Sequence, residues 1–270
     1  MDALIIAAGY GSRLRELSDS KPLTPVAGVP LLELGIRQAI AAGVTRAVVV
    51  TGHQAIEIEK FLPSLSARVG IPIISERVQH WSTPNGHSVV AGAAKIAGNY
   101  LLLMADHIFE DAILKRLAQE GTKSRGVTLA IDRRTDNPLV DPQDATWVKT
   151  DRDGRIEAIG KSIADYDAVD CGAFLATPEL AAAIKAAIAE GKPGSLSEGM
   201  QRLADAGRAA TMDIGDAWWL DVDDPRAHAL AEAEAPKHLP GIFVEACSPP
   251  LRPYALSQAA KAAIERGSTP

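Results

Sequence analysis

The sequence predicts an α/β protein with a mixed, mainly parallel sheet and helices on both faces of that sheet. In the first half of the chain, short apolar runs alternate with segments of helical apolar spacing, which is typical of parallel strands joined by helices. In the second half, the turn Asp151-Arg152-Asp153-Gly154 separates two strand-like segments, which indicates an antiparallel hairpin. With 270 residues, of which 47% are hydrophobic, the chain can bury one substantial core.

Local signals set the element boundaries in the first half. The apolar run 3–6 enters a glycine-rich loop, Gly43 ends a helix, and Pro63 is expected to end another. The run 100–105 is the most apolar strand and stops abruptly at Asp106. The expected strands of this half are 3–6, 47–51, 71–74 and 100–105, and the expected helices are 30–42, 55–62 and 87–97.

The second half adds antiparallel strands that we expect to form a small substrate lobe. Its expected strands are 127–131, 146–150, 156–159, 170–176 and 209–214, and its expected helices are 178–189, 197–206 and one that opens at 218–225 and ends near Glu234. From residue 236 onward, proline, glycine and scattered apolar residues replace this pattern. We therefore predict a domain over 1–235 and a C-terminal tail over 236–270, with a final helix near 258–266.

Composition narrows the class of partner and the compartment. The formal net charge of -6 argues against a nucleic-acid or anionic membrane surface, because either would favour a basic face. The two cysteines are too few for a disulfide framework, which fits a reducing cytoplasm. We find no signal peptide and no segment apolar enough for stable membrane insertion. Self-association as a homodimer is left open by the sequence.

The loop over 7–23 has the features of a phosphate-binding loop. Gly9 and Gly11 let the backbone turn tightly and present N–H groups that suit phosphate oxygens. Arg13 and Lys21 add two positive charges to the same loop. We therefore expect a small polyanion as its ligand.

Spacing separates this loop from two better-known phosphate loops. A dinucleotide-binding loop needs a third glycine where this chain has Leu14, and an acid at the end of the second strand, which 48–52 lacks. A P-loop runs from its lysine straight into a helix, whereas Lys21 is followed by Pro22. Both patterns are weak here, although a hydride-transferring dinucleotide enzyme stays an alternative.

Two aspartates follow apolar segments and are candidate metal ligands. Asp106 ends the run 100–105, and Asp221 follows Trp218-Trp219-Leu220. Divalent cations commonly neutralise the charge of bound polyphosphates, and carboxylates are their preferred ligands. The simpler interpretation is helix capping, which we favour for Asp223 and Asp224 ahead of Pro225.

The motifs taken together resemble those of a known family. The string Ala-Ala-Gly-x-Gly-Ser-Arg-Leu, followed by Lys-Pro-Leu, resembles the signature of nucleotidyltransferases that activate phosphorylated sugars and alcohols. The order of the later motifs is similar to that of the CTP:inositol-1-phosphate cytidylyltransferase family, which has phosphocholine and aminoethylphosphonate cytidylyltransferases as relatives. These motifs are Asn85-Gly86, Met104-Ala105-Asp106-His107, Gly154-Arg155-Ile156, Ile159-Gly160-Lys161, 169–174 and 219–225. The resemblance covers the chain from Met1 to about Glu234.

This resemblance implies a Rossmann-like fold of the nucleotide-diphospho-sugar transferase type, and a role for each matching residue. It implies that Asp106 and Asp221 hold Mg²⁺, with Asp106 also at the nucleotide. Arg13 and Lys21 would be catalytic, because they would stabilise the crowded negative charge. It also implies that Asn85 and Gly86 contact the base and ribose, and that Lys161 and Asp170 contact the acceptor. The residues implied to contact the triphosphate are Ala8, Gly9, Gly11, Ser12, Arg13 and Lys21.

The implied reaction transfers CMP from CTP to a phosphorylated polyol, with inositol 1-phosphate as the expected acceptor and CDP-inositol and pyrophosphate as products. Gly160-Lys161-Ser162 stands where sugar-nucleotide relatives show Glu-Lys-Pro, which disfavours a plain hexose acceptor. Inositol enzymes of this family are often fused to a membrane lipid-forming domain, and we expect any such partner to be a separate protein. The alternatives are another acceptor, namely phosphocholine, aminoethylphosphonate or a sugar 1-phosphate, and a non-catalytic nucleotide-sensing module.

Overall fold

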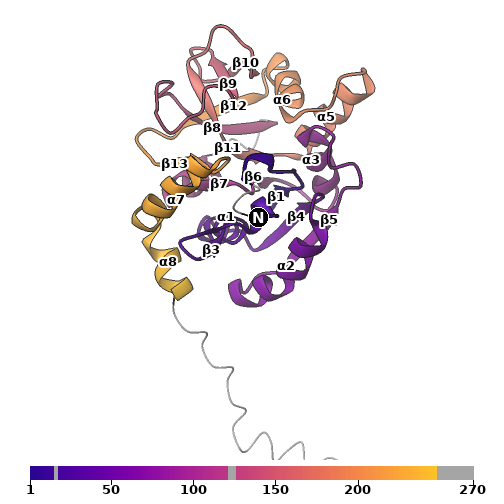
Figure 1. Cartoon of the computed structure of the whole chain (residues 1–270). Helices are drawn as coiled ribbons and strands as arrows, with labels where there is room; N and C mark the ends of the chain where they lie inside the picture. The colour runs from indigo at the N-terminus through magenta and orange to yellow at the C-terminus, as the bar shows by residue number, and fades with distance from the viewer. Residues whose placement is uncertain (15–17, 121–125, 248–270) are drawn as a thin grey trace, which may run out of the picture.

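A nine-stranded mixed sheet forms the centre of the protein. The computed structural model describes residues 1–14, 18–120 and 126–247, and Figure 1 shows their arrangement. The main strand order is β10-β9-β11-β6-β1-β4-β5, and β8 pairs with both β11 and β12. The strands are β1 (Asp2–Ala7), β4 (Arg46–Thr51), β5 (Ile73–Arg77), β6 (Tyr100–Met104), β8 (Val127–Asp132), β9 (Trp147–Thr150), β10 (Ile156–Gly160), β11 (Ala168–Ala176) and β12 (Ala209–Asp213).

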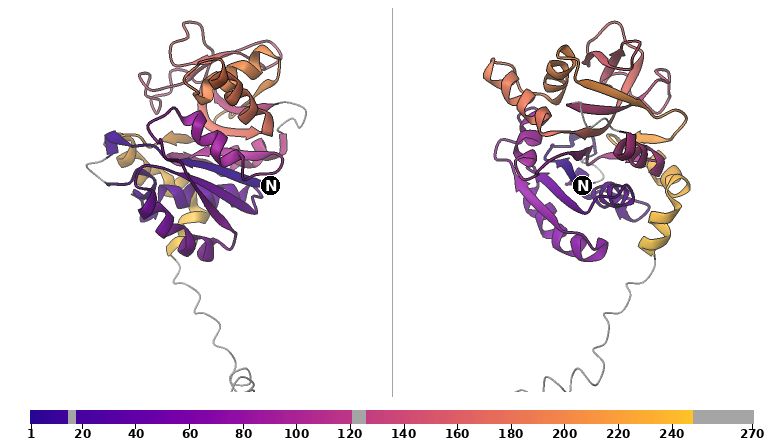
Figure 2. Two further views of the ribbon diagram at one scale, coloured as in Figure 1. Left: turned by 90° about the vertical axis from the view of Figure 1, so that its right-hand side faces the viewer. Right: turned by 180° about the vertical axis from the view of Figure 1, so that it is seen from behind.

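The two halves of the sheet differ in strand direction, as the sequence predicts. Strands β6, β1, β4 and β5 are parallel neighbours, whereas β11 runs antiparallel to β6, β8 and β9. Strands β9 and β10 form the expected antiparallel hairpin. Both views of Figure 2 show this second half, drawn in pink and orange, above the indigo and purple first half. The small antiparallel lobe is therefore present.

Helices cover both faces of the sheet because alternate residues of the parallel strands enter two different cores. In β1, Ala3 and Ile5 pack with side chains of α1, α2 and α4, whereas Leu4 packs with α3, α5 and α6. The helices are α1 (Leu31–Ala41), α2 (Ala55–Val69), α3 (Asn85–Ala93), α4 (Asp111–Glu120), α5 (Pro178–Ala189) and α6 (Leu196–Asp205). The predicted fold class is thus confirmed.

Several predicted boundaries were wrong. Helix α2 continues through Pro63 to Val69, because Leu62 and Leu65 are both buried and continue the apolar face of the helix. The predicted helix over 87–97 begins earlier, at Asn85, and ends at Ala93. Neither helix α4 nor the short strand His107–Phe109 that precedes it was predicted.

A small two-stranded ribbon completes the part of the fold that bears the candidate site. Strand β7 (His107–Phe109) pairs antiparallel with β13 (Trp219–Asp221), so two segments more than a hundred residues apart lie side by side. Two short strands, β2 (Pro25–Val26) and β3 (Val29–Pro30), follow the 3-10 turns η1 (Ser12–Leu14) and η2 (Lys21–Leu23). The segment 218–225 was predicted to open a helix, but residues 219–221 within it form strand β13, and the helix begins only at Pro225.

The chain then returns beside its own beginning through two helices, α7 (Pro225–His238) and α8 (Pro240–Cys247). Figure 1 shows them in yellow alongside the indigo segment that holds β3. Leu239, Ile242 and Phe243 are buried with Val26 and Val29 in a third apolar cluster. Helix α7 continues past residue 235. The division into a domain over 1–235 and a tail over 236–270 stays a prediction. The expected helix near 258–266 lies outside the described residues. In the described part of the chain, no helix has the length and apolarity needed to cross a bilayer.

Candidate active site

The candidate site lies at the carboxyl ends of the parallel strands, where α/β sheets commonly bind ligands. The connections after β1, β6 and β13 converge there and line two neighbouring cavities of about 270 and 510 Å³. Arg13 and Asp223 line both cavities, so the two spaces adjoin. The predicted phosphate loop and the predicted acceptor residues therefore meet at one place.

The smaller cavity contains most of the predicted phosphate-binding residues. Its lining includes Gly9, Gly11, Ser12, Arg13, Lys21, Asp106 and Asp223. Ala8 does not line it, because the Ala8 side chain is buried and its carbonyl oxygen accepts the N–H of His53 at 3.0 Å. The cavity thus combines backbone N–H groups, two cations and two carboxylates, and the predicted nucleotide role of Ala8 stays a prediction.

Lys21 is held in place by the glycine loop. Gly11 has a φ of +59°, and a Cβ there would lie 2.5 Å from the Cβ of Lys21, so only glycine lets the lysine stem pass. The Lys21 side chain is 8% exposed, and its Nζ donates to Asp106 Oδ2 at 2.6 Å. It also pairs with Asp223. This buried ammonium group therefore sits between two carboxylates at the floor of the cavity.

Arg13 connects three segments that are remote in sequence. Its guanidinium contacts Asp144 and Asp223 and lies 3.6 Å from Asp141. Burial lowers the pKa of Arg13, but the hydrogen bond and the charge of Asp144 offset this and leave it raised. The prediction that Asp223 caps a helix was wrong, because its carboxylate binds Arg13 and Lys21, whereas Asp224 accepts the N–H of Ala227 and caps α7.

The two predicted metal ligands are brought together by the β7–β13 ribbon. Asp221 is opposite His107 in the register, and the Val222 N–H donates to the Asp106 carbonyl oxygen at 2.9 Å. His107 lies between the carboxylates, with its Nδ1 at 2.7 Å from Asp106 Oδ1 and 3.7 Å from Asp221 Oδ1. Gly172 makes room for the imidazole ring, because a Cβ there would lie 2.5 Å from the ring.

Charges in this cluster perturb one another. Burial raises the pKa of Asp106, but the charges of Lys21 and His107 outweigh burial and hold the pKa well below its usual range. Burial lowers the pKa of His107, but Asp221 and Asp106 outweigh it and raise the pKa to about 9. Burial raises the pKa of Asp221, and the neighbouring Asp106 adds to the rise. The cluster therefore combines Asp106, which is firmly ionised, with Asp221, whose burial is not fully offset by neighbouring positive charge.

The donor set fits a divalent cation. One ligand atom each of Asp106, His107 and Asp221 can lie within 4.8 Å of one another, and Asp221 Oδ1 is buried without a hydrogen-bond donor. Buried carboxylate oxygens without donors are unfavourable unless a cation satisfies them. Carboxylate oxygens are also the ligands that Mg²⁺ prefers. Asp106 and Asp221 could therefore hold Mg²⁺ together.

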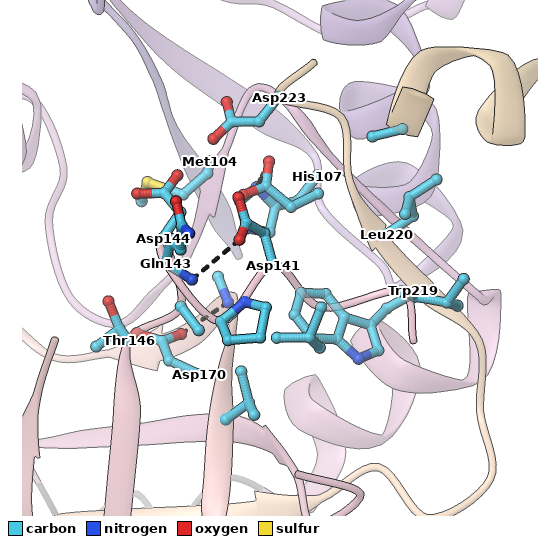
Figure 3. A pocket seen from close by; sticks show the side chains of 18 of the residues that line it. Met104, His107, Asp141, Gln143, Asp144, Thr146, Asp170, Trp219, Leu220 and Asp223 are labelled. Carbon is cyan, nitrogen blue, oxygen red and sulfur yellow. Dashed lines mark hydrogen bonds and ion pairs between the residues drawn. The ribbon is translucent and has the colours of Figure 1, made fainter. Parts of the chain in front are cut away.

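The larger cavity contains both predicted acceptor residues. Lys161 pairs with Asp144, and Asp170 accepts the Gly172 N–H at 2.7 Å where β11 bulges. Burial raises the pKa of Asp170 to about 6, although the Gly172 N–H lowers it. Figure 3 shows Asp170 and Thr146 on the side of the cavity away from Asp223. A ligand that spans this cavity can therefore meet carboxylates at both ends.

The structure gives Asn85 and Gly86 packing roles at the start of α3. Asn85 lines the larger cavity, and its Oδ1 accepts the Leu196 N–H at 2.9 Å, which joins α3 to α6. Gly86 is buried, and a Cβ there would lie 2.3 Å from the Gly194 carbonyl oxygen. Gly86 lines neither cavity. The predicted contacts of Asn85 and Gly86 with base and ribose stay predictions.

The loop over 133–146 was not predicted as part of the site, yet its residues 138–146 line the larger cavity. Asp132, at the end of β8, is fully buried and accepts a hydrogen bond from Trp219 Nε1 at 2.9 Å. Arg134 donates to both oxygens of Asp132, and Asn137 donates to one of them. Asp132 therefore fixes both the loop that carries Asp144 and the strand that carries Asp221. Its sequence signal, an acid at the end of an apolar strand, was the same one that identified Asp106.

Replacing Asp132 by alanine is expected to lower the free energy of unfolding by about 3 kcal/mol, because it leaves several buried donors without an acceptor. Urea denaturation of Asp132→Ala measures the effect, and Asp153→Ala serves as the control because Asp153 is 70% exposed in the hairpin turn. Equal midpoints for the two variants would show that Asp132 does not stabilise the loop.

The fold and the site define a class: α/β proteins of the nucleotide-diphospho-sugar transferase type, with a glycine loop and an acidic pair at one sheet edge. Residues 3–268, nearly the whole chain, match the model of a family described as the MobA-like NTP transferase domain. The chain therefore belongs to that family.

Two curated relatives match most of this chain. A bifunctional IPC transferase and DIPP synthase from Rubrobacter xylanophilus is 33% identical, over 85% of this chain and 51% of the relative. A CMP-5'-(3-aminopropyl)phosphonate synthase from Streptomyces rubellomurinus is 31% identical, over 83% of this chain and 37% of the relative. The chain thus spans about half the length, or less, of these curated relatives.

Among solved structures, the inositol-1-phosphate CTP transferase from T. maritima superimposes with a TM-score of 0.75 at 24% identity, covering 85% of this chain and 94% of the other. That similarity concerns the fold. Together with the curated relatives, it confirms the resemblance to the inositol-1-phosphate cytidylyltransferase family that the motifs indicated.

Proposed function

We propose that this chain transfers the CMP group of CTP to a phosphorylated polyol, with inositol 1-phosphate as the acceptor. The observation that carries the proposal is that the glycine-loop cavity and the larger cavity meet at Arg13 and Asp223, beside the Asp106–Asp221 pair. One cavity suits a triphosphate and the other suits its acceptor. The names of the relatives support this choice of nucleotide and acceptor.

In the proposed reaction, an oxygen of the acceptor phosphate attacks the α-phosphorus of CTP. The new P–O bond forms as the bond from the α-phosphorus to the bridging oxygen breaks, and that oxygen leaves with pyrophosphate. No covalent enzyme intermediate is needed, since catalysis comes from positioning and charge stabilisation. Mg²⁺ bound by Asp106 and Asp221 would supply neutralisation of the phosphate charge.

The chain's own cations have distinct tasks in this scheme. Lys21 is buried at the floor of the smaller cavity and would stabilise the charge that develops on the phosphates. Arg13 is 43% exposed and bound to carboxylates that a triphosphate would replace. Lys161 lines the larger cavity and is 60% exposed, which suits contact with the acceptor phosphate. The cations thus follow the path from nucleotide to acceptor.

The carboxylates of the larger cavity favour an acceptor rich in hydrogen-bond donors. Asp141, Asp144 and Asp170 all line it, and ionised carboxylates only accept hydrogen bonds. Polyol hydroxyl groups donate to such oxygens. An ammonium group would also suit them, so an aminoalkyl phosphonate acceptor is the second candidate, and the aminopropylphosphonate relative favours it.

Incubation with each nucleoside triphosphate, Mg²⁺ and a panel of phosphorylated polyols, amines and sugars tests the proposal. We expect CTP and inositol 1-phosphate to give CDP-inositol by mass spectrometry, with one pyrophosphate released per product. A CDP-linked amine would favour the second acceptor. Nucleotide binding without any product would contradict the proposed activity and would indicate a nucleotide-sensing module.

A further inference from the structure

Three aromatic rings from three separate loops meet at the glycine loop that lines the smaller cavity. Tyr10 lies between the two cavity-lining glycines of the phosphate loop, His53 follows β4, and Trp81 follows β5. The Tyr10 and Trp81 rings are nearly parallel, with centroids 5.8 Å apart and 9° between their planes. His53 meets each of them edge-on, at 4.7 and 5.0 Å. We call this set the aromatic cluster.

The fold places the aromatic cluster at the ligand-binding edge of the sheet. Strands β1, β4 and β5 are parallel neighbours, so the loops after them emerge side by side at their carboxyl ends. The His53 N–H donates to the Ala8 carbonyl oxygen at 3.0 Å, and the Val78 N–H donates to Thr51 at 2.9 Å. These bonds hold the three loops in register with one another.

Gly52 is the residue that allows the rings to meet. A Cβ at Gly52 would lie 2.5 Å from the Trp81 Cβ and 2.9 Å from the Ala8 carbonyl oxygen. A side chain there would therefore push the loop after β5 away from the phosphate loop. The close approach brings Trp81 next to Tyr10 even though the two are 71 positions apart in sequence.

The two stacked rings are partly open to solvent. Tyr10 is 40% exposed and Trp81 is 38% exposed, whereas the other three tryptophans are all buried. A flat, half-exposed aromatic pair is a platform on which planar bases stack, with little dependence on which base it is. The adjoining cavity suits a triphosphate, and a nucleotide carries its base on the same molecule as its phosphates.

We propose that Tyr10 and Trp81 form the stacking platform for the nucleobase, so that they bind the nucleoside part of the substrate while the glycine loop binds its phosphates. This inference rests on the proposed function for the identity of the nucleotide. It adds Tyr10, which occupies the variable position of the glycine-loop motif, and Trp81, which lies outside the motifs of the family resemblance. Stacking supplies affinity for the base, and it leaves the choice among bases to other contacts.

Inorganic tripolyphosphate separates the base from the phosphates and is the probe for this inference. We expect Trp81→Leu and Tyr10→Leu each to weaken binding of CTP by about tenfold or more, because base stacking on an aromatic ring contributes that much to affinity. Binding of tripolyphosphate should change by less than about twofold. Trp81→Phe and Tyr10→Phe retain a ring and should restore most of the affinity. Calorimetric titration with Mg²⁺ present measures both ligands.

Tyr166 provides a matched control. It is also 40% exposed, and it stacks on Trp147 with centroids 4.1 Å apart in the antiparallel lobe. Tyr166→Leu should leave both affinities unchanged. Because Trp81 is the tryptophan open to solvent, CTP should also quench the tryptophan fluorescence of the wild type, and tripolyphosphate should not.

The outcomes distinguish this inference from the proposed function. Equal losses of CTP and tripolyphosphate affinity, or no loss of either, would overturn the stacking platform and leave CMP transfer standing. Trp81-dependent binding of several nucleoside triphosphates in a protein that forms no CDP product would support the platform and contradict the proposed function.

Discussion

Replacing Lys21 by alanine is expected to lower the turnover number by roughly 10² to 10³-fold, which is the scale of removing one preorganised electrostatic group from an active site. Lys21 is 8% exposed, and its ammonium group is held by Asp106 and Asp223 at the floor of the smaller cavity. A charge fixed there needs no reorganisation when negative charge builds up on the phosphates. Water at the vacated position cannot supply the same fixed charge.

The fold should survive this substitution, because both carboxylate partners of Lys21 stay partly open to solvent and can be hydrated. Steady-state kinetics with saturating CTP and acceptor measures the turnover number, and thermal unfolding reports on the fold. Lys60→Ala is the control, since Lys60 is 68% exposed on α2 and pairs with Glu57 on the same helix. Full activity in Lys21→Ala would remove Lys21 from the mechanism.

Replacing Asp106 or Asp221 by asparagine is expected to lower turnover by at least about 100-fold and to raise the Mg²⁺ concentration needed for half-maximal activity. Each substitution keeps the shape of the side chain and removes one anionic ligand oxygen. Asp106 lies in the turn just before β7, and Asp221 ends β13 more than a hundred positions later, yet the pairing of β7 with β13 sets them on either side of His107.

The double variant gives a sharper test of a shared ion. Residues that act as one unit are strongly non-additive, so Asp106→Asn combined with Asp221→Asn should be little worse than the poorer single variant. Manganese binding in the presence of CTP, followed by paramagnetic resonance, gives a readout that is independent of turnover. Asp165→Asn is the control, because Asp165 is 82% exposed on the antiparallel lobe. Fully multiplicative losses would mean that the two aspartates act separately.

The sequence predicted those parts of the fold and site that depend on local pattern. Alternating apolar runs identified the strands of the parallel half, and the spacing of Gly9, Gly11, Arg13 and Lys21 identified the loop that lines the smaller cavity. Asp106 was found because an acid at the end of an apolar strand must lie at the sheet edge. Each of these inferences needs only residues that are close in sequence.

Features that depend on long-range pairing escaped prediction. The strand 219–221 looked like the opening of a helix, because its partner β7 is only three residues long and carries no strand pattern of its own. Asp223 has the sequence context of a helix N-cap residue. Only the folded chain shows that its carboxylate pairs with Arg13 and Lys21. Pro63 failed as a helix terminator because the buried side chains on either side of it outweigh one lost backbone hydrogen bond.

The proposed reaction requires one metal-nucleotide complex bound jointly by the glycine loop and by Asp106 and Asp221. Crystals grown with CTP and Mn²⁺ test this directly through the anomalous scattering of manganese. We expect a manganese peak in contact with one oxygen of Asp106 and one of Asp221, with the triphosphate against Gly9 to Arg13. A manganese ion bound away from either aspartate, or a triphosphate outside the glycine loop, would contradict the proposed reaction.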